Sequence, residues 1–167
     1  AEEMRDAGCI GLFFGVETGS QRILKAMNKH NTVEQNGACM ALCRDVGITS
    51  SCYLIFGFPG ENEESVQETL AWLDQWKPDR AHYSTFMPLH GTDTWKHPEK
   101  YGIRIRRDYR QWYYYDLPDF PVDYLPPNPS NAEMYDLRLR FQAAFGALGY
   151  LGWKETVVPT MSASAGG

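Results

Sequence analysis

The chain has 167 residues, enough for one domain of ordinary size. Its 16 Lys and Arg against 21 Asp and Glu give a net charge of −5, which argues against a general binder of nucleic-acid backbones, because such binders depend on clustered cations. No apolar run approaches the ~20 residues that cross a bilayer, and four cysteines do not make a disulfide scaffold, so we expect a cytoplasmic protein with neither a membrane nor a nucleic-acid partner.

The first residues, 1–7, have a helical composition, and Gly8 suits a C-terminal cap because glycine adopts the left-handed conformation without a clash. No helix start signal precedes them, and we expect the chain to be a piece of a longer polypeptide. Residues 9–16 follow and are almost continuously apolar. That pattern is typical of a strand buried on both faces of a parallel sheet.

Strands and helices alternate in the first 92 residues. Two further apolar segments, residues 52–56 and 81–86, are predicted strands. Thr32 and Gln35 form a capping-box pattern at the start of one helix. The predicted helices cover residues 20–27, 32–46 and 63–76. Alternating strands and helices are typical of an α/β fold, either a βα barrel or a doubly wound sheet.

The pattern changes in the second part of the chain. Residues 101–124 are rich in aromatic residues and residues 118–129 in proline, and we expect an irregular segment there. Ser130 and Glu133 form a capping box that begins a helix over residues 131–148. We therefore divide the chain into a barrel part, an extension and a disordered tail. These parts cover residues 1–100, 101–158 and 159–167.

Three unusual loops follow the three predicted strands. They cover residues 17–20, 57–61 and 88–92. The carboxyl ends of parallel strands share one edge of a sheet, and that edge binds ligands in barrels and in open α/β sheets. The sequence therefore predicts a binding face built from these loops.

The same loops carry a family resemblance. Residues 15–20 (GVETGS) and 24–29 (LKAMNK) resemble the fourth strand and following helix of radical S-adenosylmethionine (SAM) enzymes. Residues 54–61 (LIFGFPGE) resemble the fifth-strand motif of that family, and residues 88–92 (PLHGT) its P-x-x-G-T turn after the sixth strand. The ordered set of motifs extends over about the first 100 residues.

The resemblance implies the C-terminal half of a partial (β/α)6 barrel, with strands four to six. It also implies an enzyme that binds SAM and a [4Fe–4S] cluster and generates a 5′-deoxyadenosyl radical for hydrogen abstraction or methyl transfer on a small-molecule substrate. Residues 108–148 resemble the extension of the cobalamin-associated subgroup, so the resemblance implies possible cobalamin binding through an upstream domain.

The cluster motif C-x3-C-x2-C is absent from the chain. Cys39 and Cys43 have the first spacing, but Val46 stands at the third position. Both lie on the apolar face of a predicted helix, and Cys9 and Cys52 lie near or in predicted strands, so we interpret all four as core residues and expect no metal ligand. We expect the cluster ligands in an upstream half of the same polypeptide, without which this part would be inactive.

The resemblance also assigns the residues that bind SAM. Glu17 would accept hydrogen bonds from the ribose hydroxyls, or else act only as a helix cap. Lys29 would pair with the SAM carboxylate, or else be an exposed surface lysine. The positions expected to lie near the ribose and adenine are Tyr53, Ile55, Gly57 and Met87.

The residues alone leave other functional hypotheses open. His82 and His90 are candidate acid–base groups, although lone histidines are more often structural, and no catalytic residue is assigned. Cations interleaved with tyrosines in residues 96–110 are typical of RNA binding, although a solvated surface or domain contact fits the net charge better. A methylthiotransferase and a non-catalytic α/β module that binds a nucleotide or a partner are the alternative functions.

Overall fold

The computed structural model describes residues 1–106 and 120–150 of the chain. Its centre is a parallel three-stranded sheet in the order β1-β2-β3, formed by β1 (Gly11–Glu17), β2 (Thr49–Phe56) and β3 (Arg80–Thr85). In the register of this sheet, Gly15, Tyr53 and His82 lie opposite one another. The α/β fold with parallel strands predicted from the sequence is confirmed.

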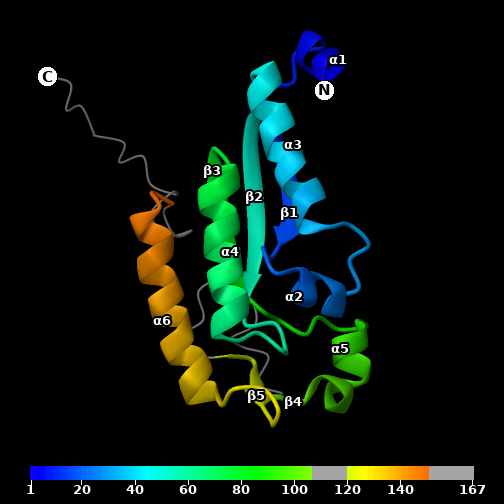
Figure 1. The fold of residues 1–167 in the computed structure, drawn as a ribbon. Helices are drawn as coiled ribbons and strands as arrows, with labels where there is room; N and C mark the ends of the chain where they lie inside the picture. Colours follow the sequence, from blue (N-terminus) through cyan, green and yellow to red (C-terminus); the bar gives the residue numbers. More distant parts are fainter. Residues whose placement is uncertain (107–119, 151–167) are drawn as a thin grey trace, which may run out of the picture.

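Three long helices cover one face of the sheet. Figure 1 shows α3 (Val33–Val46), α4 (Glu63–Trp76) and α6 (Asn131–Ala147) on the same side of the strands. The capping boxes predicted for α3 and α6 are present, and Asn62 and Ser65 form a third at the start of α4. The main core lies between these helices and the sheet. Its fully buried members include Val16, Met40, Leu73, Met134 and Phe145.

Shorter elements gather at the two ends of the sheet. α1 (Glu2–Asp6) lies beyond the amino ends of the strands, as Figure 1 shows. α2 (Gln21–Ala26) and α5 (Asp93–Lys96) lie at the opposite, carboxyl edge, where a 3-10 helix, η1 (Pro98–Tyr101), follows α5. None of the helices in the described ranges has the length and apolar character that crossing a bilayer requires.

The extension is more regular than its composition predicts. β4 (Ile103–Ile105) and β5 (Val122–Tyr124) form an antiparallel ladder, so the prediction of an irregular segment over residues 101–124 is wrong at both of its ends. Pairing between residues about 20 positions apart, each strand only three residues long, leaves no local periodicity to detect. Residues 107–119 and the predicted tail, residues 159–167, lie outside the described residues.

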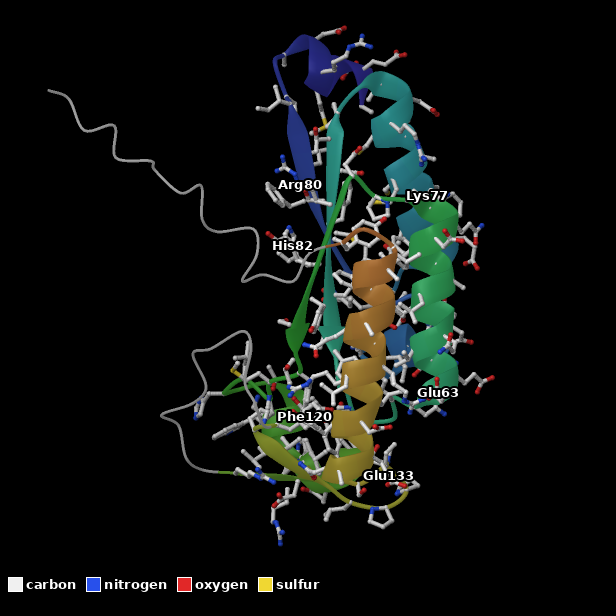
Figure 2. The ribbon with its side chains drawn as sticks, turned by 90° about the vertical axis from the view of Figure 1, so that its left-hand side faces the viewer. Glu63, Lys77, Arg80, His82, Phe120 and Glu133 are labelled. Atoms are coloured by element: carbon white, nitrogen blue, oxygen red, sulfur yellow. The ribbon has the colours of Figure 1, made fainter. Side chains whose placement is uncertain are left out.

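The face of the sheet opposite the helices is open in the described chain. Phe13 of β1 is 67% exposed, so the prediction that this strand is buried on both faces is wrong. Tyr53 packs against Phe13 at 5.9 Å and stacks on His82 at 5.4 Å between ring centroids. In Figure 2, Arg80 and His82 of β3 point away from the helix layer. The helix layer therefore buries only one face of the sheet.

Candidate functional site

A cavity of about 1340 Å³ lies at the carboxyl edge of the sheet. The end of each strand contributes to it, and α2, the loop of residues 57–61, the segment 86–100 and the extension form the remaining walls. Ligand cavities are typically about 300–1,000 Å³, so this one is large enough for a small-molecule ligand. The binding face predicted from the three loops is thus a real concavity.

Glu17 and Lys29 lie together in the wall of this cavity. The Lys29 ammonium donates to the Glu17 carboxylate at 2.7 Å, with the side chains 41% and 16% exposed. The backbone of Glu17 is left-handed, with φ of 67°, which is uncommon for a residue with a side chain and is often found at functional sites. The structure therefore brings the two predicted residues into one ion pair at the end of β1.

Gly15 makes room for this ion pair. A Cβ atom at Gly15 would lie 2.7 Å from Glu17 Oε1 and 3.8 Å from Lys29 Nζ. The carboxylate therefore occupies the space that a side chain at position 15 would take. No role was predicted for this glycine, because the contact depends on how the Glu17 side chain folds back over β1.

The four other predicted SAM contacts divide into two groups. Ile55 and Met87 line the cavity. Tyr53 is not among the lining residues and stacks on His82 on the open face of the sheet. Gly57 is also not a lining residue, although Phe58, Pro59 and Gly60 beside it are. The loop of residues 57–61 therefore reaches the cavity through a different part of its backbone.

A buried carboxylate, for which no role was predicted, holds this loop. Glu61 is only 3% exposed and accepts a hydrogen bond from the Gly57 amide. Burial raises its pKa to about 8, although the Gly57 amide and the charge of Arg22 oppose this shift. The signal in the sequence was a charged residue inside an otherwise apolar and glycine-rich loop.

α5 and η1 supply a polar cluster to the cavity wall. Asp93 Oδ2 accepts hydrogen bonds from Lys100 Nζ at 2.7 Å and from the Tyr101 hydroxyl at 2.5 Å, and all three residues line the cavity. The Lys100 hydrogen bond, followed by that of Tyr101, lowers the pKa of Asp93. This cluster was not predicted, because α5 and η1 carry no motif.

The candidate histidines lie away from the cavity lining. Burial lowers the pKa of His82, whose ring stacks on Tyr53, and His90 packs beside Trp95 at 5.0 Å between ring centroids. Neither residue lines the cavity. The acid–base hypothesis for these two histidines gains no geometric support.

The basic segment 96–110 is partly neutralised where the structure describes it. Lys100 pairs with Asp93, and both Arg104 and Arg106 pair with Asp123. Residues 107–110 lie outside the described residues. These ion pairs fit the solvated-surface interpretation of the segment, and the absence of a nucleic-acid partner stays a prediction.

The four cysteines form no cluster site. Cys43 and Cys52 are buried in the core, as predicted, and Cys9 and Cys39 are half-buried at its margin. No group of three or more His, Cys, Asp or Glu side chains suited to a metal occurs in residues 1–106 and 120–150. Burial raises the pKa of Cys52 to about 12, which disfavours the thiolate that iron requires.

We therefore expect the 167-residue chain to assemble no stable [4Fe–4S] cluster by itself. The core packing of Cys43 and Cys52 would have to be broken before their thiolates could reach iron. Anaerobic reconstitution, followed by visible absorption and iron analysis, is the measurement. A product with about four irons per chain, retained after gel filtration, would contradict this expectation.

Comparison with protein families and curated proteins gives consistent matches. Residues 1–73 match the model of the Radical SAM superfamily. The chain is 34% identical over 89 residues to an anaerobic magnesium-protoporphyrin IX monomethyl ester cyclase of Rubrivivax gelatinosus, covering 53% of this chain and 16% of the relative. It is 38% identical over 99 residues to a tRNA-2-methylthio-N(6)-dimethylallyladenosine synthase of Thermotoga petrophila, covering 55% and 22%. The chain thus spans less than a quarter of the length of these relatives.

Two solved structures share the fold. The radical S-adenosylmethionine methyltransferase TsrM of Kitasatospora setae, with cobalamin and a [4Fe–4S] cluster bound, superposes with a TM-score of 0.56 at 19% identity, covering 89% of this chain and 34% of that one. The Elp3 protein of Methanocaldococcus infernus superposes with a TM-score of 0.53 at 22% identity, covering 59% and 24%. The first likeness extends over most of the chain, whereas the second covers little more than half of it.

Proposed function

We propose that this chain, whose residues 1–73 match the model of the Radical SAM superfamily, is the C-terminal part of a radical SAM enzyme and that its cavity binds SAM. The family uses SAM and a [4Fe–4S] cluster, which together supply a 5′-deoxyadenosyl radical when bound. The cysteines of this chain do not fit a cluster, so its ligands would come from the preceding part of the polypeptide.

The observation that carries the proposal is the composition of the cavity wall. The Glu17–Lys29 ion pair and the apolar side chains of Ile55 and Met87 line the same cavity. A ligand with hydroxyls, a carboxylate and an apolar aromatic ring would find a partner here for each group. Glu17 would accept from the ribose hydroxyls, and Lys29 would bind the carboxylate.

Binding SAM in this way replaces the Glu17–Lys29 contact. An ion pair with a partly exposed lysine contributes about 0–1 kcal/mol, so exchanging it for ligand contacts costs little. The pair also holds both charges at the cavity before the ligand arrives. Glu17 and Lys29 are therefore partners in the free protein and would contact different parts of SAM in the complex.

The extension favours the cobalamin-associated subgroup over a methylthiotransferase. The fold likeness to TsrM covers 89% of this chain and therefore includes most of the extension. The similarity to the methylthio synthase covers only 55% of the chain. We further propose a small-molecule substrate for the whole polypeptide, with cobalamin held by another part of the same polypeptide.

The Gly15→Ala variant tests the SAM site. In the full-length protein we expect it to bind SAM about threefold to tenfold more weakly, because the new methyl group displaces the Glu17 carboxylate from its position over β1. The displaced atom is the end of a flexible side chain, so the fold should remain. Isothermal titration calorimetry measures the affinity, and circular dichroism checks the fold.

The matched control is Gly11→Ala. Gly11 lies four residues earlier on the same face of β1, and a Cβ there meets Thr49 O at an ordinary 3.5 Å. Both substitutions restrict the unfolded chain equally. Equal SAM affinities for the two variants would contradict the assignment of Glu17 to the ligand, and a parent protein without measurable SAM binding would overturn the proposed function.

A further inference from the structure

The loop of residues 57–61 forms one wall of the cavity, through Phe58, Pro59 and Gly60. It is an irregular loop between β2 and α4, so no sheet or helix ladder fixes its backbone. Instead, the backbone amide and carbonyl of Gly57 and of Gly60 form hydrogen bonds with side chains. Those side chains therefore decide the shape of the wall.

Tyr124 binds the backbone of Gly57. Its hydroxyl, in a side chain only 6% exposed, donates to the carbonyl oxygen of Gly57, whose amide donates to the buried carboxylate of Glu61. Gly57 is left-handed, with φ of +86°, and a Cβ there would lie 2.8 Å from the Tyr124 hydroxyl and 2.9 Å from the Phe120 ring. The aromatic side chains of the extension thus pack directly on this glycine.

Asn128 binds the backbone of Gly60. Its Oδ1 accepts from the Gly60 amide at 2.7 Å, and its Nδ2 donates to the carbonyl oxygens of Tyr101 and Gly102 at 2.9 and 2.8 Å. From the other side, Arg22 of α2 donates to the Gly60 carbonyl at 2.8 Å. One amide side chain therefore links three segments at the cavity, and Asn128 itself lines it.

We propose that Tyr124 and Asn128 are positioning residues, through which the extension sets the shape of the SAM cavity. The extension is then part of the binding site and not a separate domain attached to the barrel. The positioning role rests on the hydrogen bonds above, and its consequence for SAM rests on the proposed function.

Two variants of the full-length protein test the proposal, Tyr124→Phe and Asn128→Ala. Each removes side-chain hydrogen bonds to the loop, and Tyr124→Phe keeps the aromatic packing on Gly57. We expect amide hydrogen exchange in residues 57–61 to become about threefold to tenfold faster, as the loss of one hydrogen bond predicts. We expect the affinity for SAM, measured by calorimetry, to fall by a similar factor.

The matched control is Ser130→Ala. Ser130 caps α6 and its side chain bonds only within its own capping box in the described contacts, so its loss weakens the extension without touching the loop. We expect this variant to melt at a lower temperature while exchange in residues 57–61 and SAM affinity remain at the parent values. If exchange and SAM affinity change in the two test variants and not in Ser130→Ala, a general loss of stability does not explain the change.

The two readouts separate the possible failures. Unchanged exchange in residues 57–61 of both test variants would overturn the positioning role. Faster exchange with parental SAM affinity would also overturn it, because the wall would then have no effect on the ligand. Faster exchange in a protein whose parent does not bind SAM would support the positioning of the loop and overturn the proposed function instead.

Discussion

Replacing Glu17 with alanine is expected to weaken SAM binding to the full-length protein at least tenfold. The variant loses a charged acceptor for the ribose hydroxyls, and a hydrogen bond to a charged group contributes about 1.5–3 kcal/mol, or roughly tenfold to more than a hundredfold in affinity. The left-handed backbone at position 17 is as unfavourable for alanine as for glutamate, so the fold should not change. Calorimetry with circular dichroism checks both expectations.

Two further variants test whether the loss of SAM affinity comes from the Glu17 carboxylate itself. Asp45→Ala removes an exposed acidic side chain of α3 that is not among the cavity-lining residues, and it should bind SAM like the parent. Lys29→Ala should lose less affinity than Glu17→Ala, because its ammonium is more exposed. If Glu17→Ala binds SAM as tightly as Asp45→Ala, the carboxylate serves only the ion pair with Lys29 and the ribose assignment is wrong.

A second large effect is expected from Glu61→Gln, on the pH dependence of stability. Burial raises the pKa of Glu61 to about 8 in the folded protein, from an ordinary value of 4.5. Each pKa unit corresponds to about 1.4 kcal/mol, so the difference amounts to several kcal/mol as an order of magnitude. Glutamine keeps the acceptor for the Gly57 amide and cannot ionise, and we expect it to remove this dependence.

The sign of the pH dependence follows from the state, folded or unfolded, in which Glu61 holds its proton more tightly. Below about pH 4.5 the Glu61 carboxyl is protonated in both the folded and the unfolded chain, and its contribution to stability is constant. Between about 4.5 and 8 only the folded chain keeps the proton, so the free energy of unfolding falls as the pH rises. At the alkaline end of this window the variant should therefore be the more stable protein.

Urea unfolding near both ends of this pH window is the measurement, with Glu64→Gln as the control. Glu64 is an exposed residue in the first turn of α4, so its neutralisation should leave the pH profile of the parent unchanged. Arg22 on α2 and Tyr124 on β5 face Glu61 and remain in every variant. A Glu61→Gln protein that is less stable than the parent at the alkaline end would show that the carboxylate is ionised and required there.

Local sequence signals predicted most of the helices and the three parallel strands. Capping boxes at Thr32 and Ser130 begin α3 and α6 as expected, because the cap and the third helical residue are near neighbours in the chain. The cap of α4 was missed, since Ser65 replaces the usual Glu or Gln at the third position. The burial predicted for Phe13 was wrong, because an apolar run shows that a face can be covered and not which segment covers it.

Apart from Lys29, which follows α2, the candidate site was predictable where it coincides with a strand end. Glu17, Ile55 and Met87 each lie at the carboxyl end of a strand or just after it, and all three line the cavity. Contacts made across long stretches of chain left no such signal. Asn128 and Tyr101 line the opposite wall, although nothing near them in the sequence points to the sheet.

The two hydrogen bonds that join the loop to the extension also determine when the site can form during folding. Gly57 and Tyr124 are 67 residues apart in the chain, and Gly60 and Asn128 are 68 apart. Closing such long loops is slow compared with forming adjacent helices and strands, because the entropy of the intervening chain is lost before the contacts are gained. On the ribosome, the three strands emerge well before Asn128 does. The cavity therefore takes its final shape late, after the sheet that carries Glu17 has been synthesised.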